Sequence, residues 1–197
     1  MAQKFYAVKE GKVPGVYCSW AECKEQVNGY RGAIYKSFSS KQEAVNFISG
    51  ASISSRPEKN DDMAYHIYVD GSYSQQRYSW GFAVYKNGEL IYKKNGLGKD
   101  PNAAKLHNVA GEVQGTIEAV LWAQAENIDY IVIHHDYIGI SEWAEKRWKT
   151  NNEITKRYAE FMQPHLCWVK FNKVAGHTGV AGNELADRLA KQALGLV

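Results

Sequence analysis

Residues 64–73 constrain the fold most strongly, because they describe a β-strand that ends in a carboxylate. Polar and apolar side chains alternate with a period of two from Tyr65 to Asp70, and Gly71 follows as a turn signal. An Asp-Gly pair is also an ordinary turn, so Asp70 alone does not indicate chemistry. A catalytic role for Asp70 requires further carboxylates that converge on it.

The chain from residue 64 onward has the pattern of an α/β domain. The Asp70 strand is followed by two more strands, and the turn 86–88 (Lys-Asn-Gly) predicts that they form an antiparallel hairpin. Helical spacing of apolar residues predicts a long helix over 109–127. We expect the remaining strands at 78–85, 89–94, 129–136 and 166–172, and the remaining helices at 138–148, 153–162 and 182–194.

Residues 1–50 predict a small separate module of ββαβα type. Ser19 is placed to cap a helix over 20–27, with Glu22 in the capping-box position. The segment holds seven Lys/Arg and four Asp/Glu, so the net charge of +3 lies there. Aromatic residues are interleaved with these cations, which is a common way to grip nucleic acid. The same aromatics could also simply build a small core.

Residues 51–63 are polar, carry Ser and Pro, and predict a flexible linker before a second domain at 64–197. The three cysteines show no CxxC spacing, which argues against a disulfide framework or a zinc site. We find no signal-peptide core and no apolar run long enough to span a bilayer. We therefore expect a cytoplasmic protein that does not associate with membranes.

Three carboxylates are expected to meet at one edge of the sheet. Asp70 and Asp136 each end a strand, and Glu112 lies in the first turn of the long helix. Carboxylates that repel one another in this way suit hard divalent cations, and two ions can support phosphodiester cleavage. Asp187 is less clear, because helical spacing points it away from the apolar face of its helix. His177 lies in a small-residue loop, where it is either merely exposed or able to shuttle protons.

Four motifs in order resemble type 1 ribonuclease H over residues 64–195. They are Tyr68-Val-Asp-Gly-Ser72, Asn108-Val-Ala-Gly-Glu112, His135-Asp136 and the segment from Gly176-His177 to Gly182-Asn-Glu-Leu-Ala-Asp187. Residues 4–50 resemble the hybrid-binding domain that precedes many such enzymes, on Phe5-Tyr-Ala-Val8, Gly15-Val-Tyr17, Ser19-Trp20 and Ile34-Tyr-Lys-Ser-Phe38. The resemblance implies a mixed five-stranded sheet flanked by helices.

The resemblance also implies an activity and a set of residue roles. The protein would be an endonuclease that hydrolyses the RNA strand of RNA–DNA hybrids and leaves 5′-phosphate and 3′-hydroxyl ends. Two Mg²⁺ ions, with Mn²⁺ as a substitute, would be held by Asp70, Glu112, Asp136 and Asp187. His177 would assist proton transfer or product departure, and Asn108 and Glu112 would lie near the RNA 2′-hydroxyls. We expect a monomer whose hybrid-binding residues are Tyr6, Trp20, Tyr35 and Lys36.

The sequence departs from the family pattern in three places. Tyr137 follows Asp136 where Ser or Asn is commoner, and Ser37 stands where relatives often carry a second Lys. Residues 138–152 are shorter than the basic protrusion of single-domain members, although Lys146, Arg147, Trp148 and Lys149 keep some of its character. We expect the N-terminal module to supply the substrate grip that this shorter segment lacks.

Two other functions remain open at this point. The chain could be a non-catalytic protein that binds RNA–DNA hybrids or double-stranded RNA, but such a relative would be expected to have lost at least one carboxylate. It could also be another nuclease or recombinase of the same fold. The final helix with Asp187, preceded by the His177 loop, favours ribonuclease H.

Overall fold

The computed structural model describes residues 4–39, 41–49, 64–176 and 179–197. The chain divides into two compact units, Met1–Glu58 with Pro164–Trp168, and Lys59–Gln163 with Val169–Val197. The predicted linker 51–63 lies outside the described residues, and the predicted domain limits 1–50 and 64–197 stay predictions. Segment 164–168 belongs to the first unit, although the sequence pattern placed it in a strand of the second.

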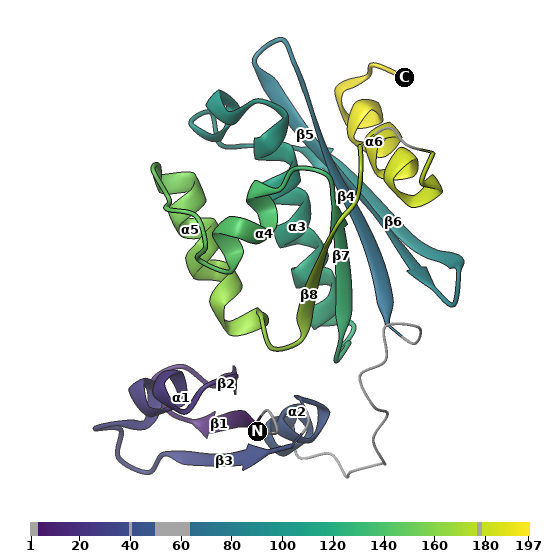
Figure 1. Cartoon of the computed structure of the whole chain (residues 1–197). Coiled ribbons are helices and arrows are strands. Elements are labelled where there is room, and N and C mark those ends of the chain that lie inside the picture. The colour runs from purple at the N-terminus through teal and green to yellow at the C-terminus, as the bar shows by residue number, and fades with distance from the viewer. Residues whose placement is uncertain (1–3, 40, 50–63, 177–178) are drawn as a thin grey trace. The chain divides into compact units, whose positions relative to one another are not determined.

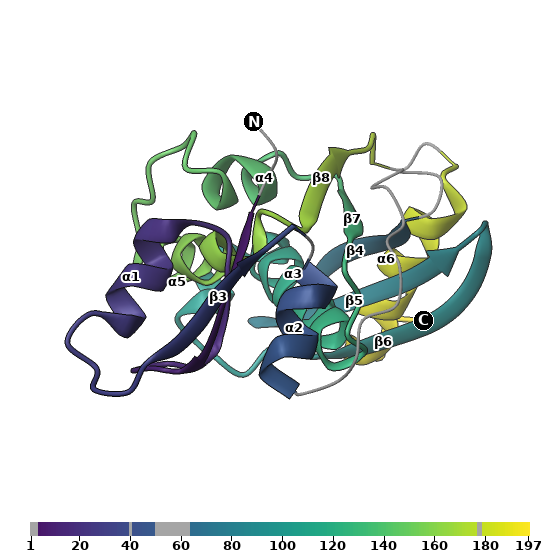
Figure 2. The ribbon, with the colours of Figure 1, turned by 90° about the horizontal axis from the view of Figure 1, so that it is seen from below.

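The first unit is a three-stranded antiparallel sheet with two helices. Figures 1 and 2 show this unit in two views. Its strand order is β2-β1-β3, and both helices contact β1. The predicted capping box is present, because Glu22 N–H donates to Ser19 Oγ (3.2 Å) and Ser19 N–H donates to Glu22 Oε2 (3.1 Å). The elements are β1 (Phe5–Glu10), β2 (Gly15–Tyr17), α1 (Trp20–Val27), β3 (Ile34–Phe38) and α2 (Lys41–Ser49).

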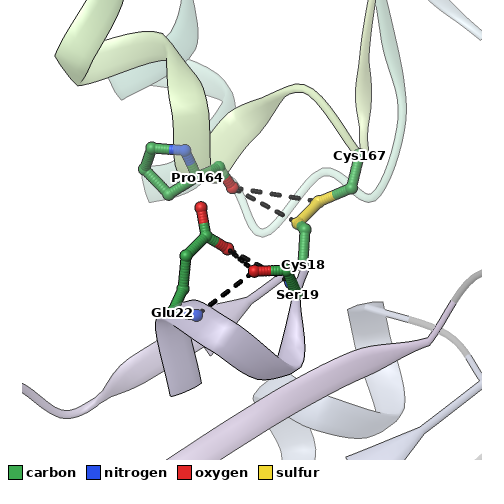
Figure 3. The surroundings of a disulfide bond; sticks show 5 residues. All are labelled: Cys18, Ser19, Glu22, Pro164 and Cys167. Carbon is green, nitrogen blue, oxygen red and sulfur yellow. Dashed lines mark hydrogen bonds between the residues drawn. A yellow bond between two sulfur atoms is a disulfide. The ribbon is translucent and has the colours of Figure 1, made fainter. Parts of the chain in front are cut away.

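A disulfide joins Cys18 to Cys167 within the first unit (Figure 3). The two Cα atoms lie 5.8 Å apart, which is an ordinary separation for a bridged pair. Both sulfur atoms lie against the carbonyl oxygen of Pro164, at 3.4 Å and 3.8 Å. The expectation of no disulfide was therefore wrong. Residues 149 positions apart give no local spacing signal, and the third cysteine, Cys23, is free and buried.

The second unit is built on a mixed five-stranded sheet of order β6-β5-β4-β7-β8. The first three strands form an antiparallel meander, and β4, β7 and β8 run parallel to one another. This confirms the expected α/β fold class and its mixed five-stranded sheet. The strands are β4 (Tyr65–Ser74), β5 (Arg77–Lys86), β6 (Glu89–Leu97), β7 (Ile131–His135) and β8 (Val169–Lys173).

Helices cover both faces of this sheet (Figure 1). One face is covered by α6, and the other carries α3, which contacts β4 and β5, with α4 and α5 beside it. The buried core residues on β4 and β5, among them Ile67, Val69 and Phe82, lie between these layers. The helices are α3 (Asn108–Ala125), α4 (Gly139–Ala144), α5 (Glu153–Met162) and α6 (Ala181–Leu194).

The backbone of α3 lies directly on the backbone of β4, because glycine occupies both contact points. A β-carbon at Gly71 would lie 2.5 Å from Glu112 N and would also meet Asn108 O. A β-carbon at Gly111 would lie 2.6 Å from Gly71 Cα and would also meet Ser79 O. No larger residue fits at either position without moving backbone. This contact brings the first turn of α3 against the strand that carries Asp70.

A similar contact seats α6 on the opposite face. A β-carbon at Gly81 of β5 would lie 2.6 Å from Ala186 O and 2.7 Å from Ala190 N. Ser79 Oγ donates to Ala190 O at 2.6 Å, and Asn95 Nδ2 donates to Leu189 O at 2.7 Å. These two bonds tie the C-terminal half of α6 to β5 and β6.

Several predicted elements have other bounds in the structure. The strand predicted to end at Asp70 and turn at Gly71 continues to Ser74, because its pairing with β5 runs on past Asp70. The helix predicted over 138–148 ends at Ala144, and Lys146 has a positive φ of 57°, which no continuing helix allows. The strand predicted over 166–172 begins only at Val169, after a 3₁₀ turn at Gln163–His165. Among the described helices, none is long and apolar enough to span a membrane.

We expect Gly111→Ala to destabilise the protein by about 2 kcal/mol or more, because its methyl group would be forced into backbone atoms of β4 and β5. Gly115→Ala, one turn later, is the matched control. Its β-carbon would meet only ordinary contacts near 3.5 Å, and alanine favours helix by about 1 kcal/mol. Urea unfolding followed by circular dichroism measures both, and equal stability of the two variants would contradict the close-contact argument.

Candidate active site

Three carboxylates from three elements converge at one edge of the sheet. Ligand oxygens of Asp70, Glu112 and Asp136 all lie within 4.8 Å of one another. The strand register explains why Asp70 and Asp136 lie close together. Tyr68 of β4 pairs with His134 of β7, so the residues two positions further along, Asp70 and Asp136, lie at the same level. Glu112 joins them because α3 starts on β4 at the contact between Gly71 and Gly111.

Backbone donors fix two of these carboxylates. Gly71 N–H donates to Asp70 Oδ1 at 2.7 Å, and Tyr137 N–H donates to Glu112 Oε2 at 3.2 Å. The other carboxylate oxygen of Glu112, Oε1, is buried and has no hydrogen-bond partner among the described residues. Glu112 as a whole is only 1% exposed. An unpaired buried carboxylate oxygen is costly unless something positive reaches it.

The pKa values of the cluster record its burial and mutual repulsion. Burial, followed by the charge of Asp136, raises the pKa of Asp70 to about 7. The same two causes, with a smaller contribution from Asp70, raise the pKa of Glu112 to about 9. Without a bound cation these groups therefore hold protons that isolated carboxylic acids would release near pH 4.

The donor set fits a hard divalent cation. All three side chains offer carboxylate oxygens, which are the ligands that Mg²⁺ and Mn²⁺ take in proteins. A cation would satisfy Glu112 Oε1 and remove the repulsion that raises the pKa values of Asp70 and Glu112. Metal binding would thus displace protons from the cluster.

Asp187 of α6 lies near this cluster but is not one of the three close ligands. Its charge contributes to the raised pKa of Asp70, and its Oδ2 accepts a hydrogen bond from Lys191 Nζ at 2.8 Å. The side chain is 22% exposed, so it does not face bulk solvent as the helical spacing indicated. A pocket of about 340 Å³ opens beside it, lined by Glu184, Asp187, Arg188, Lys191 and Val197.

Two further residues, His177 and Asn108, were predicted to act at this site. His177 lies outside the described residues. Asn108 is exposed at the first position of α3, four residues before Glu112, so both lie on the same face of the helix. Its place beside the cluster is compatible with a contact to substrate, and its role stays a prediction.

The predicted aromatic residues of the first unit form one row. The Trp20 ring centroid lies 5.8 Å from that of Tyr6 and 5.8 Å from that of Tyr35. Trp20 and Tyr35 are 45% and 46% exposed, so their rings are available for stacking. Lys36 is not part of this row. It follows Tyr35 on β3 and so projects from the other face of the strand, where its Nζ lies 5.5 Å from the Phe38 centroid.

Sequence reasoning missed several residues that shape the site. The backbone donor of Tyr137 and the close contact between Gly71 and Gly111 depend on tertiary packing, and a single sequence gives no sign of it. The pair between Lys191 and Asp187 could have been found, because residues four positions apart on a helix are neighbours.

Comparisons with known proteins cover both units. Residues 62–195 match the family model described as RNase H, and residues 4–48 match the model described as Ribonuclease H1 N-terminal domain. Among curated proteins, Ribonuclease H1 of Mus musculus is 26% identical over 261 residues, covering 95% of this chain and 88% of the mouse protein.

Solved structures share the fold of the second unit. RNase H1 from Halobacterium salinarum superposes with a TM-score of 0.56 at 20% identity, covering 68% of this chain and 99% of that one. LC11-RNase H1 in complex with an RNA/DNA hybrid gives a TM-score of 0.52 at 15% identity, covering 66% of this chain and 99% of that one. At these identities the likeness concerns the fold alone.

We expect Asp70→Asn to stabilise the metal-free protein near neutral pH. Because the folded-state pKa of Asp70 is raised, its ionisation lowers stability as pH rises from about 4 to about 7. A shift of roughly three pKa units corresponds to at most about 4 kcal/mol. The gain should be full above pH 7 and should vanish below pH 4.

Urea unfolding in the presence of a chelator, repeated from pH 4 to pH 8, measures this difference. Asp100→Asn is the control, because Asp100 lies outside the cluster and pairs with Arg157 at 3.6 Å. Saturating Mg²⁺ should stabilise the original protein more than Asp70→Asn. If the difference in unfolding free energy between the original protein and Asp70→Asn did not change with pH, the raised pKa of Asp70 could not be its cause.

Proposed function

The chain belongs to the ribonuclease H family, and we propose that this enzyme hydrolyses the RNA strand of RNA–DNA hybrids by two-metal-ion catalysis, leaving 5′-phosphate and 3′-hydroxyl ends. The matches to the RNase H domain and to the ribonuclease H1 N-terminal domain support the enzyme class and the hybrid substrate. The observation that carries the metal-dependent mechanism is the group of Asp70, Glu112 and Asp136, whose oxygens lie within 4.8 Å.

We assign the metal ligands to Asp70, Glu112, Asp136 and Asp187, with Mg²⁺ as the cofactor and Mn²⁺ as a substitute. A divalent cation at such a site can activate water as a nucleophile and stabilise the leaving oxygen. The chain's own contribution is to hold the ligands in place before the cation binds. Gly71 N–H fixes Asp70, Tyr137 N–H fixes Glu112, and Lys191 offsets the charge of Asp187.

The remaining roles concern the substrate. Asn108 and Glu112 would meet the 2′-hydroxyls of the RNA strand, the group that distinguishes RNA from DNA. His177 would assist proton transfer or product departure. Trp20 and Tyr35, with Tyr6 beside them, would stack on the hybrid. Lys36 would meet a phosphate from the opposite face of β3. We also propose a monomer acting in the cytoplasm.

Cleavage of a labelled hybrid with Mg²⁺ tests the activity, beside the same RNA as a single strand and as an RNA duplex. We expect cutting of the hybrid alone. Asp70→Asn should lower kcat by about a hundredfold or more, because it removes charge that must hold the metal. Asp100→Asn should cut normally, since Asp100 lies outside the cluster. Tight, salt-sensitive hybrid binding without cleavage in Mg²⁺ or Mn²⁺ would favour the binding-protein alternative.

Substitution of the aromatic row tests the substrate grip. We expect Trp20→Ala and Tyr35→Ala each to raise KM for the hybrid on the order of tenfold, because loss of one stacking contact is worth about 1–3 kcal/mol. The kcat value should change little, since the row is not part of the carboxylate cluster. Tyr30→Ala is the control, because Tyr30 is an equally exposed aromatic of the same unit that makes no ring contact with Trp20 among the described residues. Equal KM values for all three variants would argue against the assignment.

A further inference from the structure

His135 is a buried residue that the activity described above does not use. It is the last residue of β7, immediately before Asp136, and its side chain is fully buried. Its Nδ1 lies 2.9 Å from the carbonyl oxygen of Tyr137. A carbonyl oxygen only accepts hydrogen bonds, so Nδ1 must carry the proton. The imidazole therefore bonds across Asp136, from the residue before it to the residue after it.

Tyr137 is the residue through which this bond can act on the metal ligands. Its N–H donates to Glu112 Oε2 at 3.2 Å, and its carbonyl oxygen also accepts from Ile140 N–H at 3.2 Å. One residue thus receives the His135 imidazole on its carbonyl side and holds Glu112 on its amide side. The bend that carries Asp136 towards the cluster lies between the two attachments.

The other imidazole nitrogen indicates that His135 has a role besides packing in the core. Its Nε2 is buried and has no hydrogen-bond partner among the residues that the structure describes. The neighbouring Phe171 ring lies edge-on, with its centroid 5.7 Å away. A buried polar atom without a partner lowers stability, and a wholly apolar side chain would avoid that cost. The Nδ1–H donor is therefore the property that distinguishes histidine from an apolar residue here.

We propose that His135 is a positioning residue: its hydrogen bond to Tyr137 holds Asp136 and Glu112 in the arrangement that binds the divalent cation. This inference rests on the proposed metal-dependent function. It assigns to His135 no contact with substrate and no exchange of protons. The imidazole acts only through Tyr137, in the way that hydrogen bonds behind a ligand commonly orient it.

Two substitutions separate this role from simple core filling. His135→Phe keeps a ring of similar size but removes the donor, and His135→Asn places an amide N–H close to the position of Nδ1. If the donor matters, Phe should impair the site and Asn should rescue it. If only volume matters, Phe should be tolerated better than the smaller Asn. His135→Val is a second variant without a donor, should the Phe ring prevent folding.

The first measurement is amide hydrogen exchange in the full-length, metal-free protein. In His135→Phe the hydrogen bond to the Tyr137 carbonyl is lost, so Tyr137 is held less firmly and its N–H bonds less well to Glu112. We therefore expect the Tyr137 amide to lose protection relative to the amides of β7. The second measurement is calorimetric titration with Mn²⁺, where the same variant should bind about tenfold more weakly. His135→Asn should restore both values towards those of the original protein.

Ile133→Val is the matched control, because Ile133 is fully buried on the same strand and its side chain lies on the same face as His135. It should lower stability by about 1 kcal/mol and leave Tyr137 exchange and Mn²⁺ binding unchanged. Normal exchange and Mn²⁺ affinity in a folded His135→Phe or His135→Val protein would overturn the inference. If the original protein neither bound Mn²⁺ nor cut hybrid, the proposed function would fail, whereas the exchange data would still decide whether His135 holds Tyr137.

Discussion

Direct contact between two backbones is the constraint on which the carboxylate cluster depends. Asp70 and Glu112 repel each other, and burial makes their charged forms still less favourable. They stay together because Gly71 and Gly111 let α3 lie on β4 with no side chain between them. The packing of the sheet and helix therefore supplies the free energy that offsets the electrostatic cost of bringing these carboxylates together.

Local signals explain how much of the fold could be predicted. The capping box of Ser19 and Glu22 depends on four consecutive residues, so the start of α1 was predicted to the residue. Asp70 and Asp136 could be predicted to meet because both were placed at the same edge of the sheet on neighbouring strands. The prediction that Asp70 ends its strand was wrong, since β4 continues to Ser74 and only Asp136 directly follows a strand end. Asp187 shows the limit of this reasoning. Helical spacing describes a helix with one covered face, whereas α6 lies tightly on β5 and brings Asp187 to the edge of the cluster.

The features that could not be predicted from the sequence depend on tertiary structure, either through contacts between distant residues or through the direction of a side chain. Cys18 and Cys167 are 149 positions apart, and no spacing rule pairs them. Lys36 was grouped with Tyr35 on the family resemblance, which does not give side-chain direction, and adjacent residues of a strand face opposite ways. The shortened α4 follows from the positive φ at Lys146, which lysine adopts only under tertiary constraint. The hydrogen bond from His135 to Tyr137 could not be predicted either, because it depends on the bend of the chain around Asp136.

The parallel pairing of β4 with β7 has a consequence for how the site comes into being. The antiparallel meander of β4, β5 and β6 consists of sequence neighbours and can form early, whereas the pairing of β4 with β7 must wait for the whole of α3 to cross over. Until then the three carboxylates that later form the cluster lie far apart in an incompletely folded chain. Affinity for a divalent ion is thus a property of the completed topology, and in a refolding chain it would emerge only once β7 has paired with β4.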